Sequence, residues 1–497
     1  MSSPGSPASP HSERSRDLGS GHTIIPGLSS PRMQALIVFL VGFVLAAAII
    51  LTNPIIFGGD TLNRLLHRDR LLMGHQLPLL QLIIAILTRV SPNPALIRYM
   101  DALIGALAGV GFYCVVWDFF GETVAFPAAL MFVTNPFFLA LSTVPYQESL
   151  MLAGLLFAFH FFYRERWIAS SFALALACIT RYEAWAAGPV LALAYLLRKD
   201  RSLRGGITAG LLFGWMPALW ILINRGLAPR GAFVVESSLS MARLLRYVHL
   251  GWVTVRNTQL TVVLLAACGA RLLVRERSRI DWRWWIQITF LVLFLISVFF
   301  SAHGVSPDPE RYVVDREAYI PICFVLLLAA LGLARWPRWT TAIVALSMVL
   351  GVGGAFWYVR SATSQPETQL AYRLARYLDG AVRDHEAVLI LAKPIPEETY
   401  RDYLERERQR GGEDAVRQAR AEIEELGMGG TSYQKVLAYS RLGRDRLLSP
   451  PIGCAPWVAI WSDYPDATRE LSLAPPVEVL RSGPMSVTIQ QRNCKGK

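Results

Sequence analysis

Charged residues are scarce in this sequence of 497 residues. Asp, Glu, Lys and Arg make up 17% of it, whereas soluble globular domains average about 25%. Hydrophobic residues make up 53%, and the mean hydropathy is +0.36. Charge-free apolar runs of about 14 to 25 residues recur as far as residue 360, which is typical of transmembrane helices. The sequence therefore excludes a large soluble α/β protein, whose apolar strands would be shorter and separated by turn residues.

The short signatures of several enzyme classes are also missing. No Gly-rich phosphate loop, zinc-ligand spacing or Ser-His-Asp arrangement stands out. There are only six cysteines. Four lie in apolar segments, where we expect them to pack: Cys114, Cys178, Cys268 and Cys323. Cys454 and Cys494 lie near the C-terminus, and they either form a disulfide, as an oxidising compartment would allow, or remain as two thiols.

What the sequence does contain is a series of about eleven apolar segments. Residues 1–32 are rich in Ser, Pro and Gly, and we expect a disordered cytoplasmic tail there. Residues 33–52 are expected to form an uncleaved signal-anchor helix. The other spans are expected at about residues 97–117, 122–141, 147–163, 167–180, 183–197, 206–224, 249–270, 283–302, 317–334 and 339–359.

Basic loops predict the orientation of these spans. A cytoplasmic N-terminus places the most basic short loops inside, as the positive-inside rule requires: 164–166, 198–204, 271–279 and 335–338. The net charge of +12 then reflects topology, and we predict no nucleic-acid partner. The protein is expected in the inner or plasma membrane.

Two regions are expected to lie outside the spans. The apolar segment 77–90 is short and flanked by prolines, so we place residues 53–96 in one outer loop with interfacial helices at about 62–73 and 78–90. After residue 361 we expect helices at 366–382 and 396–426, and strands at 388–392, 457–461, 477–481 and 486–492. The predicted fold is a polytopic all-α membrane domain, residues 33–360, followed by an extracytoplasmic soluble α/β domain, residues 361–497.

Ionisable residues at outer helix ends are the candidates for chemistry, because charge is costly within a bilayer. Asp60 follows the first span and is a candidate general base or a helix cap. Glu148 precedes a long apolar run, where it could orient an acceptor, bind a divalent metal or cap a helix. Arg181 and Glu183 share one outer turn, as a binding pair or a structural ion pair.

Further cations are expected on the same face. Arg311, beside Tyr312, offers a planar fork of donors that suits a phosphate. The first outer loop is basic, against the positive-inside trend, and contains Arg64, His67, Arg68 and Arg70. An anionic ligand would explain this excess of cations, and so would a helix snorkelling to anionic lipid headgroups.

The order of these features resembles the GT-C glycosyltransferases, which include protein O-mannosyltransferases and lipid A aminoarabinose transferases. The resemblance covers about residues 33–335. It is carried by Asp60, His75-Gln-Leu-Pro78, Ile97-Arg-Tyr-Met-Asp-Ala-Leu, Phe119-Phe-Gly121, Asn135-Pro136, Pro145-Tyr-Gln-Glu148, Thr180-Arg-Tyr-Glu183 and Glu310-Arg-Tyr312. Family members often have a second acidic residue after the first helix, whereas Asp60 is followed by Thr61 and Leu62. This departure puts dependence on a divalent metal in doubt.

The resemblance implies an inverting transferase that takes its sugar from a polyprenyl-phosphate carrier and delivers it to a lipid, glycan or protein acceptor at the outer face. It makes Asp60 and Glu148 the catalytic carboxylates. The substrate-binding residues would be Arg64, His67, Arg68, His75, Arg181, Glu183, Arg311 and Tyr312. The alternatives are a lipid-linked glycan polymerase or ligase, and a transporter or flippase of lipid-linked sugars, although we find no internal repeat of the kind common in transporters.

Overall fold

The structure is a computed structural model. It describes residues 30–68, 77–224, 241–276, 281–300, 315–383, 386–392, separate positions between 398 and 420, and residues 430–442, 446–448, 455–462 and 473–492.

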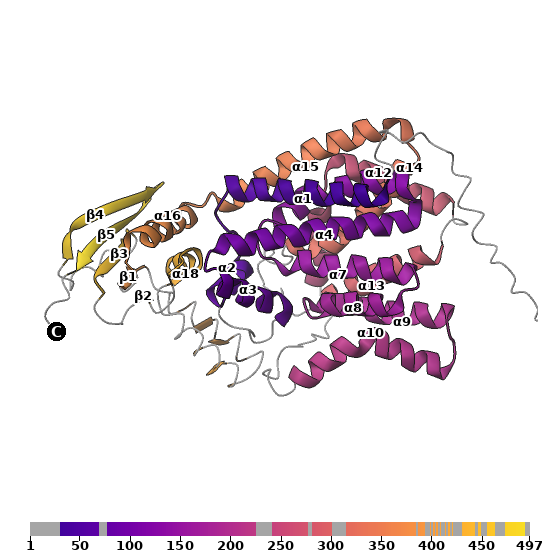
Figure 1. The fold of residues 1–497 in the computed structure, drawn as a ribbon, viewed down its shortest axis with the longest axis horizontal. Coiled ribbons are helices and arrows are strands. Elements are labelled where there is room, and N and C mark those ends of the chain that lie inside the picture. The colour runs from indigo at the N-terminus through magenta and orange to yellow at the C-terminus, as the bar shows by residue number, and fades with distance from the viewer. Residues whose placement is uncertain are drawn as a thin grey trace, which may run out of the picture.

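A bundle of helices makes up most of the described chain, and its members lie side by side in Figure 1. They are α1 (Pro31–Thr52), α4 (Pro94–Phe120), α5 (Glu122–Val133), α6 (Pro136–Leu141), α7 (Gln147–Tyr163), α8 (Trp167–Cys178), α9 (Ala187–Arg198), α10 (Leu203–Asn224), α11 (Met241–Arg256), α12 (Leu260–Arg275), α13 (Trp282–Phe300), α14 (Tyr319–Ala334) and α15 (Thr340–Thr363). Short 3-10 turns join some of them: η1 (Tyr182–Ala186), η4 (Asp315–Ala318) and η5 (Pro337–Trp339). Two helices, α2 (Gly59–Leu66) and α3 (Pro78–Val90), lie where interfacial helices were predicted, although α2 ends earlier than expected.

The surface of the bundle is apolar. Four described helices are long and apolar enough to cross a bilayer, or five spans if a bent pair counts as one. Large hydrophobic side chains are exposed along the bundle, among them Leu40, Val44, Leu193, Leu211 and Val349. Such a surface belongs in lipid rather than in water. The structure therefore supports a membrane protein, while the total of eleven spans stays a prediction.

Two expected spans are broken within the bundle. The segment predicted as one helix over 122–141 divides into α5 and α6, because the Asn135 side chain caps α6 by accepting from the amides of Phe137 and Phe138. The span predicted over 249–270 is the α11–α12 pair, which bends by 119°. The two breaks meet inside the bundle, where Asn135 Nδ2 donates to Gln259 Oε1 at 3.0 Å. Each break therefore satisfies polar groups of the other, as backbone breaks at membrane depth require.

Beyond the bundle lies the C-terminal unit, which we define as α16 (Pro366–Ala381), α18 (Gly430–Tyr439) and five strands. The strands are β1 (Val388–Leu391), β2 (Leu447–Leu448), β3 (Trp457–Trp461), β4 (Leu473–Ser482) and β5 (Met485–Arg492). They form one sheet in the order β2-β1-β3-β5-β4. Strand β1 pairs in parallel with β2 and β3, and β5 pairs antiparallel with β3 and β4. The sequence analysis missed α18 and β2.

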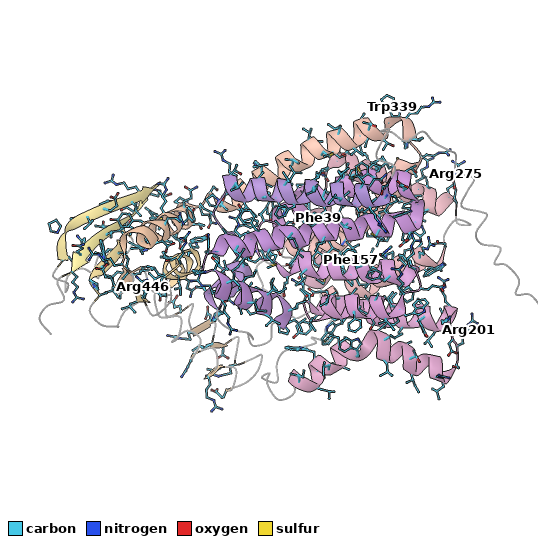
Figure 2. All side chains as sticks on the ribbon, viewed as in Figure 1. Phe39, Phe157, Arg201, Arg275, Trp339 and Arg446 are labelled. Atoms are coloured by element: carbon cyan, nitrogen blue, oxygen red, sulfur yellow. The ribbon has the colours of Figure 1, made fainter. Side chains whose placement is uncertain are left out.

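The C-terminal unit defines the sheet end of the bundle (Figure 1). One hydrophobic core joins the two regions, since it contains Ile49 of α1, Leu65 of α2, Leu374 of α16 and Val436 of α18. Side chains at the opposite end include Arg201, Arg275 and Trp339 (Figure 2). Arg201 and Arg275, from two of the predicted basic loops, and Trp339, next to a third, therefore lie at the far end, away from the C-terminal unit.

Candidate functional site

A buried arginine lies between two glutamates at the sheet end. Arg181 Nη1 donates to Glu148 Oε1, and Arg181 Nη2 donates to Glu183 Oε1. Arg181 Nε also donates to Glu183 Oε2 at 3.0 Å, which makes that pair bidentate. The exposed fractions are 2% for the Glu148 side chain, 9% for Arg181 and 23% for Glu183. We call these three residues the sheet-end cluster.

The local structure explains how these residues meet. Glu148 is in the first turn of α7, where the helix dipole favours a carboxylate. Arg181 lies after α8 in extended backbone, immediately before the turn η1 that carries Glu183. Helices α7 and α8 pack closely, so their ends at this side of the bundle bring Arg181 to Glu148. The sequence analysis placed both residues on one face but did not predict that they pair.

Two residues that the sequence analysis did not single out complete the surroundings. Asp101 of α4 is fully buried and accepts from Ser149 Oγ at 3.4 Å, one residue after Glu148. Tyr319, at the start of α14, lies 6.0 Å below the Arg181 guanidinium and donates from its hydroxyl to Met151 Sδ. Asp101 lies in the quoted stretch Ile97-Arg-Tyr-Met-Asp-Ala-Leu but was given no role there, and a lone Tyr carries no motif.

The loop with Asp60 reaches the same place. Arg64 of α2 donates from Nη2 to Gln147 Oε1 at 2.8 Å, and Gln147 directly precedes Glu148. Asp60 lies in the first turn of α2, one helical turn before Arg64, and Gly58 rather than Asp60 is the residue that precedes the helix as its N-cap. The side chain of Asp60 lies outside the described part of the structure. The geometry thus brings the helix of Asp60 to the start of α7.

Gly58 allows this approach. Its φ is +92°, a left-handed value that side-chain-bearing residues rarely adopt. A Cβ at this position would lie 1.8 Å from the Tyr146 hydroxyl oxygen. The Phe57 ring packs edge-on against Tyr146 and Tyr358, with centroids 6.4 and 6.0 Å away. The loop can therefore adopt this conformation only if residue 58 is glycine.

The remaining predicted site residues divide into two groups. His67 is buried, and its Nδ1 lies 3.0 Å from the carbonyl oxygen of Asn63. Arg68 donates from both terminal nitrogens to the carbonyl oxygen of Ser440 at 3.2 Å. The other predictions fall outside the described residues: His75, Arg311, Tyr312, and the Cys454–Cys494 pair. Of the four cysteines expected to pack, Cys268 is exposed on the bundle surface instead.

A narrow cavity opens beside Glu148. It is lined by Glu148, Ser149, Ser142, Gly105, Leu152 and Tyr319, together with apolar residues of α4, α5 and α6. Leu152 also lines a second, apolar cavity between α4, α7, α13 and α14, whose walls include Phe159, Phe290 and Phe324. The two cavities both contact α7 and share Leu152, so Glu148 lines a cavity that neighbours an apolar one inside the bundle.

The charge balance of the cluster limits its chemistry. One guanidinium faces two carboxylates, and the nearby Asp101 adds a third acid. Such a site suits hydroxyl or amine donors better than a phosphate, which Arg181 could bind only by giving up a carboxylate. Among the described residues no group of three or more His, Cys, Asp or Glu could hold a metal ion, and Glu148 already contacts Arg181. The described part of the site therefore does not fit a divalent metal.

No protein-family model matches the sequence, and no curated protein sequence matches it. Solved structures do match its fold. ArnT from Cupriavidus metallidurans in the apo state is 12% identical with a TM-score of 0.56, over 93% of this chain and 98% of that chain. The same protein bound to undecaprenyl phosphate gives a TM-score of 0.57 at the same identity and coverage. An oligosaccharyltransferase from Archaeoglobus fulgidus is 12% identical with a TM-score of 0.44, over 71% of this chain and 60% of that chain. The predicted resemblance is confirmed at the level of the fold, which this chain shares with ArnT.

Proposed function

We propose that the protein is a GT-C glycosyltransferase that moves a sugar from a polyprenyl-phosphate carrier to an acceptor at the sheet end of its bundle, which we take as the extracytoplasmic face. One observation carries the proposal: Arg181 holds two glutamates, of which the buried Glu148 lines a cavity that adjoins an apolar cavity between α4, α7, α13 and α14. The fold shared with ArnT, of which one structure holds undecaprenyl phosphate, supports it.

In the proposed reaction an acceptor oxygen or nitrogen attacks the anomeric carbon of the sugar. The bond between that carbon and the phosphate oxygen breaks, and the carrier phosphate leaves with the electron pair. Asp60, or Glu148, takes the proton of the acceptor. Attack opposite the leaving phosphate inverts the anomeric centre. Arg311 and the cations of the first loop stabilise the phosphate, because Arg181 already faces two carboxylates. Arg64 and Arg68, by contrast, donate to neutral oxygens.

The prenyl chain would run from the sheet-end cluster along α7 into the apolar cavity. A prenyl chain needs apolar walls and no polar partners. The residues that line the apolar cavity are all apolar except Gln287. The sugar would then lie where carboxylates and hydroxyl groups of the site can hydrogen-bond it.

The direct test is mass spectrometry of lipid that co-purifies with the protein. A polyprenyl phosphate is expected with the wild type, and with Leu211→Trp, whose side chain is 67% exposed on the bundle surface. Leu152→Trp places a larger side chain where the two cavities meet, and it is expected to lose the lipid at a cost of about 1–3 kcal/mol of stability. Equal amounts of bound lipid in all three proteins would contradict the proposed position of the prenyl chain. A wild-type rate of sugar transfer in Asp60→Asn would show that Asp60 is not the base.

A further inference from the structure

The loop that carries Asp60 is held from several directions. Arg98 of α4 is buried and donates from Nη1 to the carbonyl oxygen of Asn53 at 2.9 Å, and from Nε to that of Thr143 at 2.7 Å. The Asn53 side chain in turn donates to Thr363 Oγ1 at 3.0 Å, at the end of α15. The exit of α1 is therefore tied to α4, to α15 and to the segment before Glu148.

The C-terminal unit adds two further contacts to the same loop. The Tyr439 hydroxyl, at the end of α18, donates to the carbonyl oxygen of Ile56 at 2.7 Å. Two residues beyond Ile56 is Gly58, and Asp60 is two residues further. Arg68, just after α2, donates to the carbonyl oxygen of Ser440. Residues 439 and 440 thus contact the chain on both sides of α2.

The residues that make these contacts are buried. Tyr439 is 4% exposed, Ser440 is fully buried, and Ile56 is 2% exposed. Burial raises the pKa of Tyr439, so its hydroxyl keeps its proton and remains a donor. The Ser440 hydroxyl donates to Asp379 Oδ1 of α16 at 2.6 Å, which anchors the end of α18 within the C-terminal unit. The Tyr439 ring meets the Tyr372 ring edge-on at 5.7 Å.

We infer that the C-terminal unit is a positioning part of the active site: the end of α18 sets the conformation of residues 53–68 and thereby the place of Asp60. This inference rests on the proposed function, because Asp60 has a role only if transfer occurs beside Glu148. The physical reason is that a loop with a free backbone carbonyl at Ile56 would sample other conformations, and a misplaced base slows proton transfer far more than it weakens binding. Tyr439 acts through the loop and is not itself a catalytic residue.

Tyr433 provides a matched control on the same helix. It is also 4% exposed, and its hydroxyl donates to the carbonyl oxygen of Leu447 at 2.7 Å, inside the C-terminal unit. Tyr439→Phe and Tyr433→Phe each remove one buried hydrogen bond of equal length and keep the ring. Any general loss of stability should therefore be similar in the two variants.

The experiment measures amide hydrogen exchange over residues 53–68 and steady-state transfer, both on the full-length protein in lipid. Tyr439→Phe should speed exchange at these amides and lower kcat about three- to tenfold, with the donor KM within twofold, because one hydrogen bond is lost. Tyr433→Phe should change neither. Unchanged exchange in Tyr439→Phe, unchanged kcat despite faster exchange, or an equal loss of kcat in both variants would each overturn the inference. If the wild type transfers no sugar, the proposed function fails, while the exchange data still decide whether α18 holds the loop.

Discussion

In the described part of the bundle, a buried carboxylate has charged partners at each end, and the two clusters differ in charge balance. At the far end Asp118 of α4 is 3% exposed, and each of its carboxylate oxygens has a cationic or imidazole partner at 2.7 Å, namely Arg164 Nε and His160 Nδ1. Arg283 also donates to the carbonyl oxygen of Asp118. We call Asp118, His160 and Arg164 the far-end cluster. At the sheet end, by contrast, one arginine serves two glutamates.

This difference separates a structural network from a site. In the far-end cluster every oxygen of the acid is satisfied, and it ties α4 to α7 much as a buried ion pair should. The sheet-end cluster has an excess of acid, contains a side chain that lines a cavity, and receives a loop from another part of the chain. The proposed function therefore rests on unbalanced charge beside a cavity and not on buried charge alone.

Removing a carboxylate from each cluster in turn should give the largest difference in sugar transfer between the two ends. Glu148→Gln keeps the size and one acceptor oxygen of the side chain but removes the carboxylate. We expect kcat for sugar transfer to fall about 100-fold or more, the range of a lost general acid–base or orienting group. A transfer assay with a polyprenyl-phosphate sugar donor measures this, with folding checked by thermal melting.

Asp118→Asn is the matched change at the far end. It should leave kcat within twofold and lower stability by about 2 kcal/mol, because a charged hydrogen-bonded network loses its acid. Its melting temperature should therefore fall more clearly than its activity. A large loss of kcat in Asp118→Asn with unchanged melting would contradict the distinction between the two clusters.

The second prediction concerns two glycines with left-handed backbone, one at each end. Gly58, before α2, has φ +92° and the Tyr146 hydroxyl where a Cβ would lie; Gly121, between α4 and α5, has φ +79° and open space around it. Gly58→Ala should lower kcat more than tenfold, since both the backbone and the contact with Tyr146 must change beside Asp60. Gly121→Ala should cost about 1–3 kcal/mol of stability, because φ +79° with ψ −178° is a conformation that essentially only glycine adopts, without loss of transfer. Equal effects on transfer would show that the close contact at Gly58 does not matter.

The fold was predictable where hydropathy and turn residues decide it. Strand β3 occupies the expected positions, and the helix over 78–90 was expected from its prolines and its length. The Asn135-Pro136 pair favours the start of a new helix at this position. The apolar run continues through the pair, so hydropathy predicted one uninterrupted helix. The partner of Asn135, Gln259, is 124 residues away. Pairing at that separation depends on the packing of the helices, which no local pattern encodes.

The sequence predicted several residues of the site but not how they contact one another. Positive-inside loops placed Glu148, Arg181 and Glu183 on one face, and the structure brings those three together. An ion pair between Arg181 and Glu183 was one of the two interpretations of that turn, but no local pattern predicts that Glu148 also contacts Arg181. Arg98 and Gln147 lie within quoted motifs but were given no role. Arg98 and Tyr439 donate to backbone carbonyl oxygens, which every residue has, so no pattern could identify their partners.

The smallest expected effect on stability comes from the partly exposed interactions of Arg198 at the far end. Arg198 Nη2 lies 3.4 Å from Glu165, whose side chain is 58% exposed, and the guanidinium of Arg198 also lies 3.6 Å from the centroid of the Trp282 ring. Exposed ion pairs contribute about 0–1 kcal/mol, whereas a cation over an indole contributes about 0.5–1 kcal/mol or more when partly desolvated. Glu165→Gln should therefore shift the melting temperature by less than Arg198→Gln, and neither should change kcat. If Glu165→Gln costs more, the ion pair rather than the ring holds Arg198, and charge at the far end contributes more to stability than its exposure implies.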